Sequence, residues 1–371
     1  MVLLFPFMFE KTVVDENYVR IPREKLFNFV VEIFKRLDVP EEDAKIVADN
    51  LIMADMRGIE SHGVQRLKRY VDGIKVGAVN VHPNIKVVKE SPVFAVLDGD
   101  EALGQVVGYK GMKMAIEKAK KVGVGIVGVR NSNHYGIAGY YSYMAAKEDL
   151  VGVSMTTSRP LVAHTGAMEK FMGTSPISVA APVEGSRPFL LDMATSVVPS
   201  GKIEVYRRKN KPVPGDWAIS TETGEIIHDP NEILSPKGTI LPLGGLGEIS
   251  GGHKGYGLGA IVDILAGILN GATWSKHVGG TSDKHSDVGH FFMAIDPGAF
   301  GDKEEFKKNM RKFMEELKNA KKHPKFERIW VHGEKGFLTY EAREKLGVPI
   351  YKKVLDEMNA IADELGVQKL P

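Results

Sequence analysis

The chain has 371 residues, a formal net charge of +2 and no cysteine, and 43% of its residues are hydrophobic. These values are ordinary for a globular protein of about two domains, and they give no basic field for nucleic acid or an anionic membrane. Without cysteine, disulfides, thiolate metal sites and cysteine nucleophiles are excluded, which fits a cytoplasmic location.

The two apolar stretches of the chain predict neither secretion nor a membrane anchor. The start, Met1 to Phe9, has no basic flank, so we expect no signal peptide. Residues 257–269 contain Asp263 and are too few to span a bilayer.

Helical patterns dominate the N-terminal part of the chain. Residues 22–37 and 40–57 carry apolar side chains at helical spacing, and Gly58 is a suitable helix stop. A third helix is expected over residues 61–76. The pattern changes after Gly77.

Strand patterns prevail in the middle of the chain, and helices return near its end. Strands are predicted at residues 85–89, 93–97, 124–130, 151–156, 176–181, 188–193 and 291–295. Helices are predicted at residues 104–122, from Gly255 to about Asn270, at 304–319 and at 340–364. Residues 208–251 are rich in glycine and proline and predict a long, functional loop.

The order of these elements predicts an α/β protein of two units. Residues 77–301 would form a sheet-rich domain. Residues 1–76, joined by residues 302–371, would form a helical domain built from both termini. No internal repeat changes this division.

One glycine motif imitates a dinucleotide fingerprint. Gly123, Gly125 and Gly128 match G-x-G-x-x-G, but they lie in an apolar, β-branched run after a predicted helix. The helix start that would hold a pyrophosphate is missing. We therefore predict a strand here and not a Rossmann domain.

The stretch RGIESHGVQR, residues 57–66, is the first candidate for chemistry. If a helix restarts near Ser61, His62 and Arg66 share one face, four residues apart. Together they could present a proton-transfer group and a clamp for a carboxylate. The alternative is an N-capping serine with two solvated neighbours.

Four further segments could bind a ligand. Residues 131–136, NSNHYG, place His134 directly after a predicted strand. Residues 173–176 and 191–196 are small and hydroxylated after apolar strands, whereas residues 251–257, GGHKGYG, open a helix and suit an anion. The alternatives are a loop histidine and ordinary strand exits.

A histidine-rich loop leaves a metal site open. His277, Asp283, His285, Asp287 and His290 lie close in sequence, but their spacing matches no zinc motif. They would suit a metal-dependent hydrolase, which is the alternative enzyme class. A nucleotide-binding protein without turnover is the third possibility.

Taken in order, these motifs resemble the type 2 malate/L-lactate dehydrogenase family, also called sulfolactate dehydrogenase-like. The resemblance covers about residues 20–365 and rests on RGIESHGVQRL (57–67), VRNSNHYGIAGYY (129–141), GTSPIS (173–178), LDMATSVV (191–198), the run 201–219 and GGHKGYGLG (251–259). It implies an NAD(P)-dependent 2-hydroxyacid dehydrogenase with a non-Rossmann, mixed-sheet cofactor domain. It also implies a homodimer with the active site near the subunit contact.

The resemblance also implies residue roles. His62, next to Ser61, matches the family's catalytic histidine, His134 matches a second histidine that some members use as acid/base, and Arg66 matches a contact to the substrate carboxylate. The cofactor-contacting segments hold Ser158, Asp192, Met193, Ala194, Thr195, Ser196, His253, Lys254, His332, Gly333 and Glu334. His253 departs from relatives with an aromatic residue at this place, so that contact is the less secure one.

Physical requirements then suggest a mechanism. Reducing a 2-keto acid takes a hydride from the cofactor and a proton from the protein, and imidazole suits the proton. We expect His62 to transfer it, with His134 orienting the oxygen, although the two roles could be exchanged. Malate is the first choice of substrate, with lactate, sulfolactate or imino acids as alternatives. NAD or NADP stays open, because the basic run 207–209 could accept a phosphate or be solvated.

Overall fold

The computed structural model describes residues 15–283 and 285–371, so Met1 to Phe9 lie outside the described residues. The helices are α2 (Arg23–Arg36), α3 (Glu41–Met56), α4 (Leu67–Lys75), α5 (Gly104–Val122), α6 (Ala138–Ala146), α7 (Ser200–Arg208), α8 (Pro230–Leu234), α9 (Gly252–Val262), α10 (Lys303–Asn319), α11 (Glu334–Leu346) and α12 (Lys352–Leu365). The strands are β1 (Tyr18–Ile21), β2 (Lys86–Glu90), β3 (Phe94–Asp98), β4 (Val124–Ser132), β5 (Val151–Thr156), β6 (Ile177–Ala181), β7 (Phe189–Met193), β8 (Ala218–Ser220), β9 (Gly238–Ile240), β10 (Val288–Ile295) and β11 (Val348–Tyr351). Among these described residues, no helix is long and apolar enough to cross a membrane.

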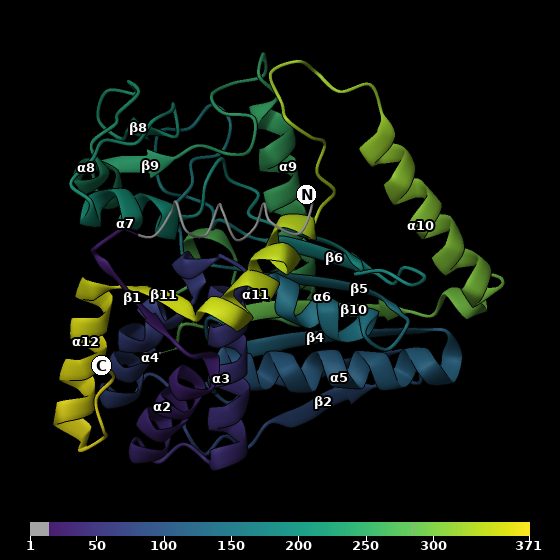
Figure 1. The fold of residues 1–371 in the computed structure, drawn as a ribbon, viewed down its shortest axis with the longest axis horizontal. Helices are drawn as coiled ribbons and strands as arrows, with labels where there is room; N and C mark the ends of the chain where they lie inside the picture. Colours follow the sequence, from purple (N-terminus) through teal and green to yellow (C-terminus); the bar gives the residue numbers. More distant parts are fainter. Residues whose placement is uncertain (1–14, 284) are drawn as a thin grey trace.

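One mixed sheet forms the centre of the molecule (Figure 1). Its strands follow the order β2-β3-β4-β10-β5-β6-β7. The pair β3–β4 is parallel, whereas the other neighbouring pairs are antiparallel. A Rossmann domain is built on a mostly parallel sheet, so the prediction of a non-Rossmann, mixed α/β fold is confirmed.

Helices cover both faces of this sheet. Phe292 on β10 packs among the apolar residues of α5 and α6, whereas its neighbour Phe291 packs with Val262 and Ala266 of the α9 region. Successive strand residues point to opposite faces, so one strand supplies both layers of core.

The glycine motif lies in strand β4, as predicted. A side chain at Gly125 would meet the main-chain oxygen of Ala115 at 2.0 Å, and one at Gly128 would meet the Asn270 amide at 1.9 Å. These glycines therefore let β4 pass close to α5 and to the turn at Asn270.

The two ends of the described chain meet in a small sheet. Strand β1 pairs antiparallel with β11, and one apolar core joins α2, α3 and α4 to β11 and α12 (Figure 1). Helix α10 packs elsewhere, with Met314 against Val183 and Val331. The domain boundaries at residues 76 and 302 stay predictions.

Several predicted elements need correction. The third helix does not begin at residue 61: two 3₁₀ turns, η1 (Glu60–His62) and η2 (Val64–Arg66), precede α4, because Gly63 is extended between them. The helix expected at 340–364 is two helices, which Gly347 and strand β11 separate. The region 208–251 contains β8, α8 and β9, and α6, α7 and β1 were not expected.

Candidate active site

A pocket between α4, the exit of β4 and the exit of β5 gathers residues that lie far apart in the sequence. Four of the predicted site residues line it: His62, Arg66, His134 and Ser158. Further lining residues include Arg69, Arg159, Thr174 and Thr281. Among the residues that the structure describes, no acidic side chain lines this pocket, so it suits an anionic ligand.

The first histidine belongs to the two 3₁₀ turns. His62 ends η1, and its Nδ1 lies 2.8 Å from the Ser61 hydroxyl oxygen. A hydroxyl can donate or accept, so this contact is compatible with either tautomer of the ring. His62 and Arg66 both line the pocket, although they do not share the single helix that their spacing suggested.

The second histidine follows strand β4. Its Nδ1 lies 2.6 Å from the Tyr70 hydroxyl and 3.3 Å from the main-chain nitrogen of Gly136. The Gly136 N–H can only donate, so Nδ1 of His134 is an acceptor and Tyr70 donates to it. In the neutral ring, the proton of His134 is therefore on Nε2.

The two imidazoles face each other, with ring centroids 5.8 Å apart and planes inclined by 19°. Burial lowers the pKa of His62 from 6.5 to about 3, assisted by the charges of Arg66 and Arg69. Burial likewise holds the pKa of His134 well below 6.5, with Arg69 and His62 adding to the effect. Both rings are therefore neutral near pH 7.

The arginines of the pocket differ in their partners. Arg66 donates from Nε to the main-chain oxygen of Ser61 at 2.7 Å, and its Nη1 lies 2.9 Å from a carboxylate oxygen of Glu204 on α7. Arg69 donates to the Thr281 hydroxyl at 2.7 Å. Among the described residues, no carboxylate pairs with Arg69 or Arg159.

Three of these site residues were missed from the sequence. Arg69 and Tyr70 follow Arg66 by three and four residues, which is one helical turn, and that spacing could have indicated them. Arg159 directly follows Ser158 at the exit of β5. Their convergence with His134 depends on how α4 lies against the sheet, which the sequence does not specify.

The segment that follows β7 lies next to the pocket. The Thr195 hydroxyl donates to the main-chain oxygens of Thr174 and Ser175, at 3.2 and 3.0 Å, and Thr174 lines the pocket. The buried Asp192 carboxylate accepts from the Gly139 N–H at 2.8 Å, and burial raises its pKa. Met193, Ala194 and Ser196 belong to the same strand exit, and the Ser196 hydroxyl donates to the main-chain oxygen of Val198.

The two remaining predicted segments open helices outside the pocket lining. His253 and Lys254 are exposed in the first turn of α9, which has no side-chain cap and follows Gly251 at φ +85°. The exposed His332 precedes α11, where Gly333 has φ +91°. Glu334 pairs with Arg328 at 2.7 Å and Lys318 at 3.1 Å, so it holds this loop together.

The histidine-rich loop does not support a metal-dependent hydrolase. His290 is buried between the hydroxyls of Thr156 and Ser132, each 2.8 Å from a ring nitrogen, and Asp287 accepts from the N–H groups of Asn131 and Thr273. His285 pairs with Glu101. In the described part of the chain, no group of three or more histidine, aspartate or glutamate side chains could hold a metal ion.

Comparisons with known proteins agree on one family. The sequence model of the malate/L-lactate dehydrogenase family matches residues 21–359. A malate dehydrogenase of Pyrococcus abyssi is 65% identical over 98% of this chain and 99% of its own length. A malate/(S)-sulfolactate dehydrogenase of Methanothermus fervidus is 41% identical over 94% of this chain and 98% of its own.

A solved structure agrees with this family assignment. The malate dehydrogenase of Pyrococcus horikoshii OT3 superposes with a TM-score of 0.90 at 60% sequence identity, covering 96% of this chain and 98% of the other. Both the sequence motifs and the mixed sheet are accounted for by this relationship. The chain therefore belongs to the malate/L-lactate dehydrogenase family of oxidoreductases.

Proposed function

We propose that the protein interconverts malate and oxaloacetate with a nicotinamide cofactor. The observation that carries this proposal is the pocket in which two neutral histidines face each other beside Arg69 and Arg159. The high identity to the malate dehydrogenase of Pyrococcus abyssi supports the same substrate.

The arginines favour a substrate with two negative groups. Arg66 is already paired with Glu204, whereas Arg69 and Arg159 bring two further positive charges to the pocket. A guanidinium can bind a carboxylate through two parallel hydrogen bonds. A four-carbon dicarboxylate would pair both charges, whereas pyruvate or lactate would leave one of the two arginines without a carboxylate partner.

The two histidines have different roles at the carbonyl oxygen of the substrate. His134, with its proton on Nε2, donates a hydrogen bond to the oxygen and polarises the carbonyl. In oxidation the neutral ring of His62 takes the proton of the substrate hydroxyl. In reduction the ring first takes up a proton, which the negative charge of the bound substrate favours, and then gives it to the carbonyl oxygen. The Ser61 hydroxyl can keep its hydrogen bond to Nδ1 of His62 in both protonation states of the ring. It donates to Nδ1 when the ring is neutral and accepts from the Nδ1 proton when the ring is charged.

The cofactor is NAD or NADP, and it supplies the hydride when bound. The residues present fit such a dinucleotide. Gly251 opens the uncapped α9 beside His253 and Lys254, which suits a phosphate, and the buried Ser175 hydroxyl has no hydrogen-bond partner in the described structure. Ser158, the segment 192–196 and the loop 332–334 would surround the rest of the cofactor.

A homodimer fits the surface of the α9 region. Its exposed apolar side chains form one group, between 43% and 63% exposed: Ile261, Ile264, Ile268, Leu269 and Trp274. Apolar groups of this kind mark protein contacts. Light scattering should give the mass of two chains, and I264E/I268E should give the mass of one. A cytoplasmic location stays a prediction.

The test follows the absorbance of NADH and NADPH with oxaloacetate, pyruvate and sulfopyruvate. We expect oxaloacetate to be reduced fastest, and the preferred nucleotide identifies the cofactor. R69Q and R159Q should raise the KM for oxaloacetate at least tenfold more than that for pyruvate, whereas R311Q on the exposed face of α10 should change neither. If sulfopyruvate is reduced faster than oxaloacetate, the substrate is sulfolactate and not malate. Binding of NADH without any turnover would refute the activity.

A further inference from the structure

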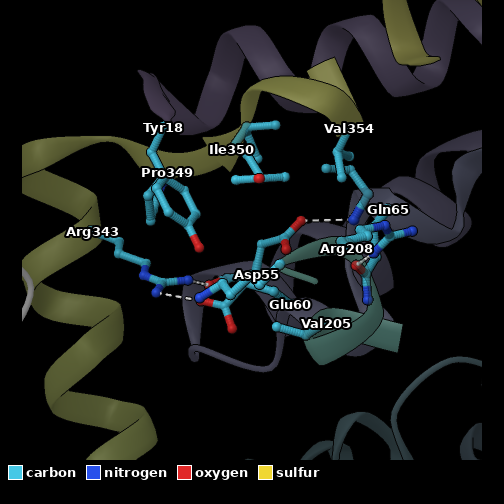
Figure 2. Close-up of a pocket in the computed structure, with 13 residues that line it drawn as sticks. Tyr18, Asp55, Glu60, Gln65, Val205, Arg208, Arg343, Pro349, Ile350 and Val354 are labelled. Carbon is cyan, nitrogen blue, oxygen red and sulfur yellow. Dashed lines mark hydrogen bonds and ion pairs between the residues drawn. The ribbon is translucent and has the colours of Figure 1, made fainter. Parts of the chain in front are cut away.

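A buried carboxyl group behind the active site has no part in the proposed chemistry. Asp55 lies near the end of α3, is 2% exposed and is not among the residues that line the pocket of the histidines. It lies instead in a second cavity, between Arg343 on one side and Gln65 on the other (Figure 2). A buried carboxyl is costly, so its contacts indicate what it does.

The carboxyl touches the segment that carries His62 and Arg66. Its Oδ2 accepts from the main-chain N–H of Val64 at 2.8 Å. A side chain at Gly63 would stand 1.9 Å from its Oδ1, so Gly63 rests directly on the carboxyl. No other residue type fits between them without moving the segment.

From these contacts we infer that Asp55 is a positioning residue that fixes the segment 60–66 on the end of α3. The inference rests on the proposed role of His62 in proton transfer. The segment needs such a fixed point, because its two 3₁₀ turns meet at the extended Gly63 and the first N–H of the second turn has no partner within that turn. Asp55 supplies the partner, as an N-cap does, but from another helix.

A second contact holds the segment from its other side. Arg343 of α11 donates to the main-chain oxygen of Asp55, and its Nη2 lies 2.5 Å from the Glu60 carboxylate. Glu60 begins the first turn and Val64 begins the second. Both turns are therefore tied to α3, one through Arg343 and one through the Asp55 side chain.

The hydrogen bond does not require a negative charge on Asp55. Burial raises the pKa of Asp55 to about 8, and Glu60 adds to this effect, whereas the Val64 hydrogen bond and Arg343 oppose it. Tyr18, Tyr351, Arg208 and Lys209 line the same cavity from β1, β11 and α7. A protonated carboxyl still accepts through its carbonyl oxygen, so asparagine should replace it.

The experiment compares D55N, D55A, G63A and the double variant D55A/G63A in the full-length protein. We expect D55N to keep kcat for oxaloacetate within about threefold, and D55A and G63A each to lower it about 30-fold with the Kd for NADH unchanged, as a displaced catalytic group does. The double variant should be no worse than D55A, because removing the carboxyl makes room for the new methyl group. D49A is the matched control, since Asp49 is on the same helix but bonds Tyr140.

A second readout does not depend on activity. Hydrogen exchange of the peptide 57–67 should be faster in D55A and unchanged in D55N and D49A. If D55N is folded but loses more than tenfold in kcat or protection, or if the losses of D55A and G63A multiply in the double variant, Asp55 is not a positioning residue. An inactive wild type with the expected exchange pattern would refute the proposed function and leave the role of Asp55 supported.

Discussion

The two segments that deliver the histidines are built in opposite ways. His134 follows a strand, and its Nδ1 receives two donors of which one, the Gly136 N–H, can never accept. His62 ends a 3₁₀ turn, and its Nδ1 contacts a serine hydroxyl that can do both. The pocket therefore holds one ring with a fixed tautomer and one ring whose Nδ1 can either carry a proton or accept one.

The largest effect should come from the ring that exchanges its proton. H62A should lower kcat about 1,000-fold, because a positioned acid/base contributes about 10²–10⁴ in rate. Binding of NADH, measured by fluorescence titration, should change less than twofold. H277A, at an exposed histidine outside the pocket, is the control and should keep full activity. If H62A is still active, the proton is transferred by His134 and not by His62.

The serine beside His62 should matter next. S61A removes the hydroxyl that stabilises the charged ring, and a hydrogen bond to a charged group is worth about 1.5–3 kcal/mol. We expect kcat to fall about 30-fold with little change in KM. S61T keeps a hydroxyl and should recover most of the activity. Equal activity of S61A and wild type would show that the ring exchanges its proton without Ser61.

A smaller effect is expected at the fixed ring. Y70F removes one of the two donors to Nδ1 of His134, but the Gly136 N–H remains and still holds the tautomer. One neutral hydrogen bond is worth about 1 kcal/mol, so kcat should fall about fivefold. A loss as large as that of H62A would show that Tyr70 takes part in proton transfer, and the comparison of the two rings would then fail.

The smallest effect concerns stability and pH. Because the pKa of Asp55 is raised to about 8 in the folded protein, its contribution to stability is full at low pH and is lost as the pH rises through about 8. D55N has no such dependence. The Tm of D55N minus the Tm of wild type should therefore increase by a few degrees between pH 6 and pH 9, measured by thermal unfolding. A constant difference would contradict the raised pKa.

Much of the fold was predictable because local sequence patterns determine these helices and strands. The apolar alternation of residues 151–156 and the glycine at the end of residues 104–122 gave β5 and α5 with their observed bounds to within a residue. Helix α6 was missed because its two faces are both buried, so no helical stripe marks it. The helix expected from residue 61 failed at Gly63, whose conformation is set by the distant carboxyl of Asp55.

The site was predictable only in part for the same reason. His62, Arg66 and His134 stand in motifs of the family, and the structure brings them to one pocket. Arg159 carries no such local signal, because its importance comes from the point at which the exit of β5 meets α4. The contact between Arg66 and Glu204 likewise joins residues 138 positions apart.

The pairing of β1 with β11 has a consequence for synthesis of the chain. The apolar faces of α2 and α3 are completed by β11 and α12, which are synthesised much later than these two helices. The helix that anchors His62 therefore cannot reach its final packing until β11 and α12 have been synthesised. Until then the nascent chain keeps this apolar surface uncovered.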